Sequence, residues 1–343
     1  MNRVSTINYP AFGSDAAETV TYTYDACGNG KGRLCGLADK TGTTSYSYDT
    51  HGRILAKSQT TLAFTQAVNY RYNAAGQMDQ MTLPSGKVVL YTYLNNRVTG
   101  ITYDGKQIVK NADYEPFGPI GEWTWGNDSV TAPNKHTRYF DLDGRNTKIE
   151  SGNSIDPAII VYDAASRITD LQKLTANAVD PAKSTSYGYD NLDRLTAITP
   201  NAGNANPSRG FGYDGVGNRL SATIAGSVTN YSYGATSHRL NGLSGATSKS
   251  FSYDNDGNRI SDGASTWSYG GNNRPTVISV SATSAVIQTG INALGQRVTK
   301  TVNGTVTRFM YDEGGRLIGE YDIDGKARQE TLWFNDLPVA VIK

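Results

Sequence analysis

The chain has 343 residues and a net charge of +1, with 38% hydrophobic residues, 18% charged residues, 37 glycines and 22 tyrosines. Its lysines and arginines are scattered, so the composition gives no support for nucleic acid as a partner. The longest apolar runs, 159–162 and 338–342, are too short for a membrane span, and residues 1–15 contain no apolar signal region. Tyrosine and threonine favour strands and glycine favours turns, so we predict an all-β chain.

The first notable residues along the chain are Cys27 and Cys35, which flank a glycine-rich stretch and which we place on the two arms of one hairpin. Two alternatives fit this spacing: a local disulfide that clips the hairpin, or two free thiols. No histidine or further cysteine lies close enough in sequence to complete a metal shell. We therefore expect no metal site, and nothing in the sequence indicates a cofactor.

A short motif, tyrosine–aspartate followed by glycine and arginine, recurs along nearly the whole chain. Its copies are YDACGNGKGRL (24–34), YDTHGRIL (48–55), YNAAGQM (72–78), FDLDGRN (140–146), YDAASRI (162–168), YDNLDRL (189–195), YDGVGNRL (213–220), YGATSHRL (233–240), YDNDGNRI (253–260), YGGNNRP (269–275), INALGQRV (291–298), YDEGGRLI (311–318) and YDIDGKA (321–327). A mean step of roughly 22 residues is in the range of repeat architectures.

Each position of the motif has a physical role in a β-hairpin. The aromatic residues before the turn alternate with small polar ones, which places the rings on one face of a strand. Aspartate accepts backbone N–H groups in a type I turn, and the glycine three residues later takes a positive φ. Asn273 and Asp193 replace this glycine and tolerate that conformation, whereas Ser166 and Ser237 are poorer substitutes, so we expect their turns to differ.

We assign a structural role to the motif residues because a residue repeated in every unit is most simply needed by every unit. On this interpretation tyrosine packs, aspartate forms the turn, and arginine is a surface charge or pairs with a neighbouring repeat. The alternative is that exposed tyrosine and arginine form a glycan-binding stripe. The representative residues are Tyr48, Asp49, Gly52 and Arg53; Tyr213, Asp214, Gly217 and Arg219; Tyr253, Asp254, Gly257 and Arg259; and Tyr311, Asp312, Gly315 and Arg316.

The repeat weakens in three places. Residues 100–160 fit worst and contain several prolines, which are confined to sheet edges, bulges and loops. Residues 175–186 and 199–209 are expected to be polar loop insertions. Because repeats resume on both sides of each gap, we predict a single repeat array over 1–343 that is less regular at 100–160.

The sequence supplies no candidate catalytic residue. The glycines at 210, 212 and 215 match a dinucleotide-binding fingerprint, but a strand and not a helix is expected to follow them. Only His51, His136 and His238 could serve as a general base, and two of them fall in repeat turns. A carbohydrate-active enzyme is disfavoured because no carboxylate pair stands out from the repeat background.

The family resemblance of the chain rests on many copies of the motif with the same spacing, each of which would be a weak match alone. The motif resembles the YD repeats of bacterial Rhs and wall-associated proteins, of the encapsulating Tc-toxin components, and of animal teneurins. The resemblance implies hairpins in a long, curled β-strip that forms a shell or partial cocoon, often around a toxin polypeptide. The aspartate-rich terminal segment that cuts the chain in many members is absent from this sequence, so we carry over the shell scaffold and not self-cleavage.

We therefore expect a non-catalytic structural shell segment that encapsulates or displays a polypeptide cargo such as a toxin. The resemblance implies a secreted or cell-surface protein whose partners are cargo or remaining shell segments, with no nucleic acid and no membrane span. The alternative is a cell-surface adhesin or carbohydrate-binding module, for which Trp123, Trp125 and Trp267 are the candidate glycan contacts.

Overall fold

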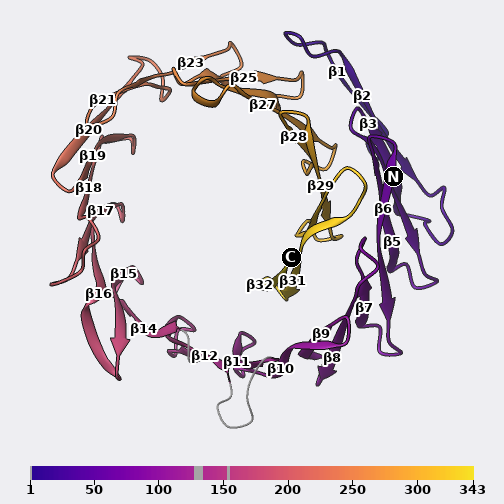
Figure 1. Ribbon diagram of the computed structural model, residues 1–343, viewed down its shortest axis with the longest axis horizontal. Coiled ribbons are helices and arrows are strands. Elements are labelled where there is room, and N and C mark those ends of the chain that lie inside the picture. Colours follow the sequence, from indigo (N-terminus) through magenta and orange to yellow (C-terminus); the bar gives the residue numbers. More distant parts are fainter. Residues whose placement is uncertain (1, 127–133, 153–154) are drawn as a thin grey trace. The chain divides into compact units, whose positions relative to one another are not determined.

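The structure is a computed structural model that describes residues 2–126, 134–152 and 155–343. In these ranges the chain forms antiparallel β-strands and one short 3-10 helix, η1 (Ser281–Thr283). The predicted all-β fold of tandem hairpins is confirmed (Figure 1). Among the described residues, no helix is both long enough and apolar enough to cross a membrane.

The strands follow one another at short intervals. The first ten are β1 (Thr6–Tyr9), β2 (Glu18–Tyr24), β3 (Leu34–Asp39), β4 (Gly42–Tyr48), β5 (Ile54–Thr61), β6 (Phe64–Tyr72), β7 (Met78–Thr82), β8 (Val88–Leu94), β9 (Arg97–Tyr103) and β10 (Lys106–Tyr114). The next eleven are β11 (Ile120–Trp125), β12 (Lys135–Phe140), β13 (Asn146–Ser151), β14 (Ile155–Tyr162), β15 (Ile168–Thr175), β16 (Ala178–Tyr189), β17 (Leu195–Pro200), β18 (Arg209–Tyr213), β19 (Arg219–Ile224), β20 (Ser227–Tyr233) and β21 (Leu240–Gly245). The last eleven are β22 (Lys249–Ser250), β23 (Ser252–Tyr253), β24 (Arg259–Ser261), β25 (Ser265–Tyr269), β26 (Pro275–Val280), β27 (Ala285–Ile291), β28 (Arg297–Val302), β29 (Thr305–Tyr311), β30 (Leu317–Tyr321), β31 (Ala327–Phe334) and β32 (Leu337–Ile342).

The chain divides into two compact units. Unit 1 consists of residues 1–108, which we call the first arm, and residues 253–343, which we call the second arm; unit 2 consists of residues 109–252. Consecutive strands pair in antiparallel fashion, as β4 does with β5 in the first arm and β18 with β19 in unit 2. The predicted single array, less regular at 100–160, stays a prediction, and residues 127–133 and 153–154 lie outside the described residues.

The motif produces the predicted hairpin turn. Gly52 has a φ of +75°, the left-handed conformation that glycine adopts without a Cβ penalty. The register shifts beside the turn: Ser47 is opposite Ala56, and Tyr48 is opposite Ile54. A three-residue loop with a left-handed residue that closes a bulge has this pairing.

The substitutes for glycine behave in two ways. Asp193 and Asn273 take positive φ values of 60° and 57°, as predicted. The prediction for Ser166 is wrong, because Ser166 also adopts a φ of +63°; the Asp163 carboxylate, which accepts the Ala165 and Arg167 N–H groups, still holds this turn. The prediction for the Ser237 turn is confirmed. Tyr233 is opposite Leu240, one residue farther along than in the regular hairpins.

One of the two predicted loop insertions is a strand. Residues 175–186 were predicted to be a loop, but β16 begins at Ala178 and runs through most of this stretch. The extra residues are absorbed in a bulge, where the Ser184 hydroxyl donates to the Asp180 carbonyl at 2.6 Å and the register against β15 shifts. The other prediction is confirmed, since residues 201–208 connect β17 to β18 without a strand.

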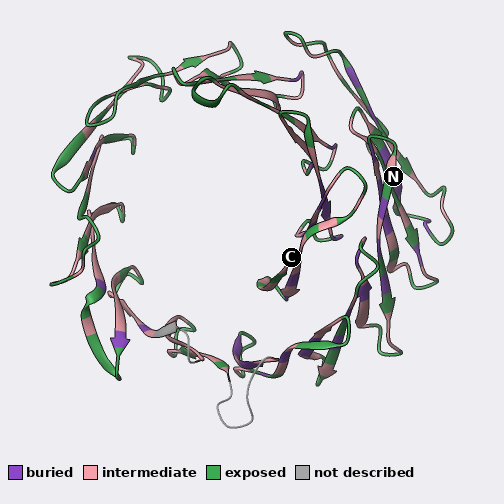
Figure 2. Cartoon of the chain, viewed as in Figure 1, coloured by how far each residue is buried: buried purple, intermediate pink, exposed green. Residues whose placement is uncertain are grey.

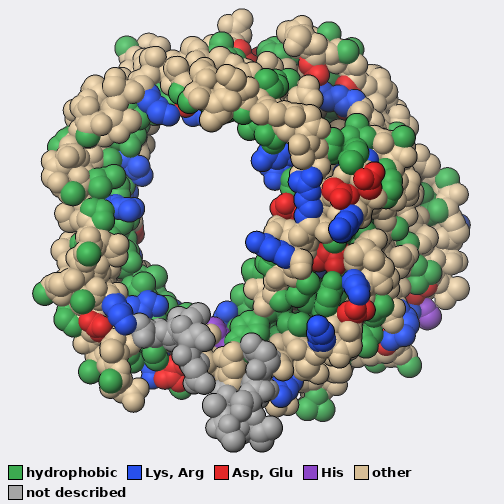
Figure 3. All heavy atoms as spheres, in the orientation of Figure 1, with side chains coloured by type: hydrophobic (Ala, Val, Ile, Leu, Met, Phe, Trp, Pro, Cys, Tyr) green, Lys and Arg blue, Asp and Glu red, His purple; other side chains and the backbone are tan. Residues whose placement is uncertain are grey.

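Burial differs between the units. The largest fully buried side chains in the described part of the chain all lie in unit 1, among them Ile101, Leu332 and Phe334. Unit 2 is mostly half-buried or exposed on both faces of its sheet (Figure 2). Acidic and basic side chains are interspersed with neutral ones on the face shown in Figure 3, which agrees with the small net charge.

Candidate functional site

The aspartate of each regular turn holds both the turn and the arginine that ends it. The Asp49 carboxylate accepts the backbone N–H groups of His51 and Arg53, each at 2.9 Å, and the Arg53 Nε at 2.6 Å. The same carboxylate–guanidinium pair, four residues apart, recurs at Asp141–Arg145, Asp163–Arg167, Asp190–Arg194 and Asp312–Arg316. At Asp163 the backbone N–H of Arg167 is the main cause that lowers the carboxyl pKa, and the Arg167 side chain adds to it.

The arginine then reaches the next repeat. The Arg53 guanidinium lies 4.5 Å from the centre of the Tyr72 ring, a cation–π contact. Corresponding contacts join Arg33 to Tyr48, Arg145 to Tyr162, Arg167 to Tyr189, Arg194 to Tyr213 and Arg316 to Trp333. The arginine therefore makes its ion pair within its own turn and reaches the neighbouring repeat in two ways, over an aromatic ring and by hydrogen bonds to the next turn. Arg145 donates to the Ser166 hydroxyl at 2.9 Å, Arg194 donates to the Asp214 carbonyl at 2.7 Å, and Arg316 donates to the Asn335 carbonyl. A charge pair with the next turn is present at Arg167, which bonds Asp193 at 2.7 Å, and at Arg316, which lies 4.0 Å from Asp336.

The tyrosine closes the link by a hydrogen bond to the preceding repeat. The Tyr72 hydroxyl donates to the Ile54 carbonyl at 2.9 Å, and the Tyr213 hydroxyl donates to the Leu195 carbonyl at 2.8 Å. Equivalent bonds are made by Tyr48, Tyr93, Tyr162, Tyr189, Tyr233, Tyr269 and Tyr311, and by the Trp333 indole N–H. We call this repeated set of aspartate, arginine and aromatic contacts the ladder, and the sheet face that carries its aromatic rings the tyrosine face.

Not all of the representative motif residues occupy equivalent positions. Asp214 and Asp254 bond the side-chain amides of Asn218 and Asn258, which take the place of the arginine. Arg219 and Arg259 follow one residue later. Arg219 lies over the Phe211 ring of its own hairpin and the Tyr231 ring of the next strand, and Arg259 lies over the Trp267 ring of the next strand, β25. An extra asparagine between glycine and arginine in the sequence is the signal of this difference. Gly217, Gly257 and Gly315 have positive φ values, and β23 contains Tyr253. That the fold requires the representative residues stays a prediction.

A buried polar seam joins the two arms of unit 1, which sequence reasoning missed. Lys57 is 1% exposed, and its ammonium donates to the carbonyls of Tyr311 and Asp312 at 3.1 and 3.3 Å and to Gln296 Oε1 at 3.3 Å. Burial lowers the pKa of Lys57 to about 8, against the opposing charges of Asp312 and Glu313. Three acceptors match the three donors of a lysine ammonium, so the charge is fully hydrogen-bonded.

Two further buried charges belong to the seam. The Arg308 guanidinium donates to the Thr61 hydroxyl at 2.7 Å and to the Thr61 and Ile323 carbonyls. Glu330 accepts the hydroxyls of Tyr103 at 3.0 Å and Tyr321 at 2.9 Å. The only sequence signal for these residues is that each is a charged residue at a position of a strand where the alternation predicts a buried side chain. That signal does not identify the partner, which lies more than 200 residues away.

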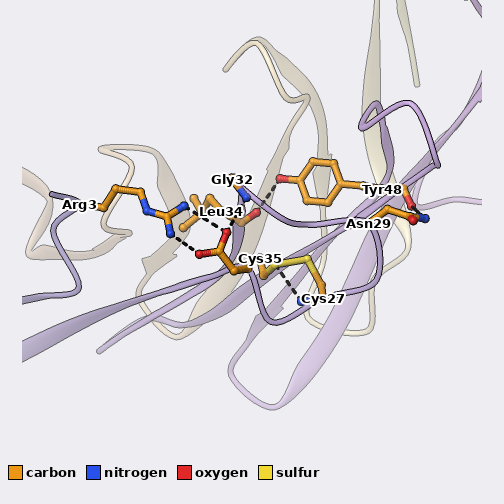
Figure 4. The surroundings of a disulfide bond; sticks show 8 residues. Arg3, Cys27, Asn29, Gly32, Leu34, Cys35 and Tyr48 are labelled. Carbon is orange, nitrogen blue, oxygen red and sulfur yellow. Dashed lines mark hydrogen bonds and ion pairs between the residues drawn. A yellow bond between two sulfur atoms is a disulfide. The ribbon is translucent and has the colours of Figure 1, made fainter. Parts of the chain in front are cut away.

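Of the two alternatives for the cysteines, a disulfide or two free thiols, the structure contains the disulfide. Cys27 and Cys35 form a disulfide across the first repeat turn, with Cys27 in the turn itself and Cys35 in β3 (Figure 4). A Cβ atom at Gly30 would lie 2.2 Å from the Cys27 sulfur and 2.6 Å from the Cys35 sulfur, so this turn requires glycine there. The Asp25 carboxylate pairs with Arg3 and accepts the Gly32 N–H at 2.5 Å.

The histidines do not form a catalytic cluster in the described residues. His51 and His238 lie in exposed turns, as predicted. His136 stacks on Trp123 at 4.0 Å, and burial, with the nearby Arg138 charge, lowers its pKa to about 4. Trp123 is only 3% exposed and packs inside unit 2. Within residues 2–126, 134–152 and 155–343, no group of three or more His, Cys, Asp or Glu side chains could hold a metal ion.

Unit 2 has an open apolar hollow on its tyrosine face. The hollow has a volume of about 320 Å³ and is lined by Ile160, Ile168, Leu171, Tyr187, Tyr189 and Leu195. Its walls carry no titratable group except the tyrosine hydroxyls. The hollow can therefore accept an apolar surface, and it offers no acid or base for chemistry.

A profile of the teneurin YD-shell family matches residues 127–330, more than half of the chain. The chain belongs to the teneurin YD-shell family. The family resemblance predicted from the repeats is thus confirmed, and a structural role in a shell follows from it.

The YD-shell fold is also found in solved structures that resemble this chain. They include crystal structures of TcdB2-TccC3 with Cdc42 (TM-score 0.61, 13% identity) and without its hypervariable C-terminal region (TM-score 0.61, 14% identity). The Tc holotoxin pore of Photorhabdus luminescens matches with a TM-score of 0.60 and 13% identity. Each match covers 96% of this chain and 22% of the other chain.

Two curated relatives match part of this YD-shell chain. The tRNA3(Ser)-specific nuclease WapA of Bacillus spizizenii is 29% identical over 119 residues, and the tRNA nuclease WapA of Bacillus subtilis strain 168 is 32% identical over 109 residues. These matches cover 34% and 32% of this chain and 5% of each relative. The chain thus spans only a small part of the length of the proteins that it resembles.

Proposed function

We propose that this chain is a non-catalytic wall segment of a shell that encloses or displays a polypeptide cargo, such as a toxin, in a secreted or cell-surface protein. The observation that carries the proposal is the ladder. Within each unit it ties hairpin to hairpin by the same three contacts, which supports a wall of repeats instead of a single pocket. Membership in the teneurin YD-shell family supports the same role.

Solution scattering tests the wall directly. A compact, solid protein of this length has a radius of gyration near 20 Å. A shell wall is expected to give a radius well above that value and a hollow-particle profile. A solid particle of about 20 Å would contradict the proposal, since such a particle has no interior for cargo.

The match to tRNA nucleases calls for a second test. The aligned part is only 5% of each WapA protein, and we assign it to the wall and not to the nuclease activity. The purified chain is therefore expected to leave tRNA intact over a long incubation with divalent cations. Cleavage by the chain, lost on substitution of His51 or His238, would contradict the non-catalytic assignment. A glycan array with no bound glycan would count against the adhesin alternative.

A further inference from the structure

Unit 1 shows how one layer of this repeat covers another. The covered surface is the tyrosine face of the first arm, where Tyr70 and Tyr91 are 5% and 9% exposed. Lys57 and Gln59 lie on the same face and hydrogen-bond to the second arm. Glu330 of the second arm reaches Tyr103 in return.

The second arm covers that surface with its opposite face, which we call the back face. In β29, Arg308, Phe309 and Met310 are all buried; Arg308 and Met310 lie on the back face and alternate with Phe309 and Tyr311, whose rings are on the tyrosine face. In β31, Glu330 alternates in the same way with Trp333 of the ladder. The contact is thus front to back: the tyrosine face of one layer meets the back face of the next.

The repeats of the two arms pair in the same order along the chain. The hydrogen bonds between them join Glu18 with Asn272, Asp39 with Ala293, Lys57 with Asp312 and Tyr103 with Glu330, at sequence separations of 254, 254, 255 and 227. The partners thus follow one another in the same order along both arms, so that successive repeats of one layer lie over successive repeats of the other in the same direction. The pairing is therefore a property of the repeat and not of one special residue pair.

Unit 2 has the same tyrosine face, and the described residues of unit 2 do not bury it. Tyr187 and Leu171 on this face are only half-buried, and Ile168 is 38% exposed at the edge of the apolar hollow. Back faces are also open: Leu90 of the first arm and Val228 of unit 2 are 37% and 42% exposed. One chain thus carries both halves of the front-to-back contact, and both are exposed.

We propose that the tyrosine face of unit 2 docks the back face of a second copy of this chain. Ile160, Leu171 and Leu195 would receive apolar back-face side chains and become buried, as Val68, Val89 and Ile101 on the tyrosine face of unit 1 are. Because the two sides of the contact differ, the interface is heterologous, and each added copy leaves another tyrosine face open. Association therefore continues beyond dimers as the concentration rises.

Analytical ultracentrifugation of the purified chain over a concentration series tests this proposal. The wild type is expected to sediment as monomers, dimers and larger species in proportions that depend on concentration. Leu171→Glu, on the tyrosine face, should reduce the sample to monomers. The double variant Leu90→Glu/Val228→Glu, on the back face, should do the same. Leu142→Glu is the matched control, because Leu142 projects from a turn tip and is fully exposed; it should leave association unchanged.

Mixing separates a lost interface from a lost fold. A Leu171→Glu chain retains its back face, and a Leu90→Glu/Val228→Glu chain retains its tyrosine face, so an equimolar mixture should form heterodimers and no larger species. Persistent monomers in the mixture, or a monomeric wild type at every concentration, would overturn the proposal. So would a wild type that binds a reduced, carboxymethylated polypeptide at Leu171 while it remains monomeric. None of these results depends on the scattering profile that tests the wall.

Discussion

Unit 1 and unit 2 are built from the same repeat but bury it to different depths. Both contain the ladder, with Tyr72 bonded to Ile54 in the first arm and Tyr213 bonded to Leu195 in unit 2. Unit 1 adds a second layer, and among the described residues the largest fully buried charged and apolar side chains lie in it. The comparison separates what a repeat contributes by local contacts from what it contributes when another layer covers it.

The largest expected effect is on the seam. Arg308→Ala leaves the Thr61 hydroxyl and the Ile323 carbonyl without their buried donor, and loss of one partner from a buried charged network costs about 3 kcal/mol or more. We expect faster hydrogen–deuterium exchange in β5 and β29 and unchanged exchange in unit 2. Arg328→Ala is the control, since Arg328 is an exposed arginine on β31 of the same arm whose hydrogen bonds to Thr307 and Val306 are exposed, and its loss should cost less than about 0.5 kcal/mol. Equal effects of the two variants would mean that the seam does not hold the arms.

The second-largest expected effect is a difference between the two units in the stability lost when a core leucine is replaced by alanine. Leu332 in unit 1 is fully buried, so Leu332→Ala is expected to cost about 3 kcal/mol through lost burial and the cavity left behind. Leu195 in unit 2 is half-buried, and Leu195→Ala should cost less than half as much. Urea unfolding, with exchange resolved by peptide to assign the loss to a unit, measures both. A similar cost at the two sites would remove the distinction between covered and uncovered layers.

Alkaline pH should also affect unit 1 more than unit 2. Burial raises the pKa of Tyr46 to about 12 and raises those of Tyr91, Tyr103 and Tyr321 as well, all in unit 1. A raised folded-state pKa contributes stability that is present below the unfolded value of about 10 and is lost as pH rises through the folded value. We therefore expect the unfolding free energy of unit 1 to fall steeply above pH 10.

The pKa of Lys57 is lowered by burial, whereas those of the tyrosines are raised, and this difference makes the pH test specific. Its folded pKa of about 8 lies below its unfolded value, so the unfolded chain binds more protons between about pH 8 and 10.5, and this group alone raises stability with pH in that window. Urea midpoints measured from pH 8 to 12 should thus show a flat or rising part before the fall. A Lys57→Met variant should lose the rising part and keep the fall. A fall that begins below pH 9 in the wild type would contradict both assignments.

The sequence predicted the local structure well because the local structure is decided by local chemistry. Aspartate, glycine and alternating tyrosine specify the turn, the bulge and the ring-bearing face within about eight residues, and the positive φ at Asp193 and Asn273 follows from the same rule. Ser166 and the 175–186 stretch were mispredicted because neighbouring contacts, the Asp163 carboxylate and a wide bulge, override the preference of a single residue.

The seam could not be predicted in the same way. Lys57 and Glu330 look like ordinary strand charges, and nothing in an eight-residue window shows that each meets a partner more than 200 residues away. Their burial depends on the stacking of layers, which a repeat pattern permits but does not specify. Sequence reasoning thus found the contacts within a layer and missed those between layers.

The smallest expected effect tests what the two units share. Tyr72→Phe in unit 1 and Tyr213→Phe in unit 2 each remove one hydroxyl-to-carbonyl bond of the ladder and keep the ring under its arginine. The net loss should be about 1 kcal/mol at each site, the usual contribution of a hydrogen bond. Tyr187→Phe is the control, because its hydroxyl makes none of the described ladder bonds, and it should change the urea midpoint least. Equal losses at Tyr72 and Tyr213 would assign the ladder to the repeat itself, whereas a loss confined to Tyr72 would mean that the ladder depends on the covering layer.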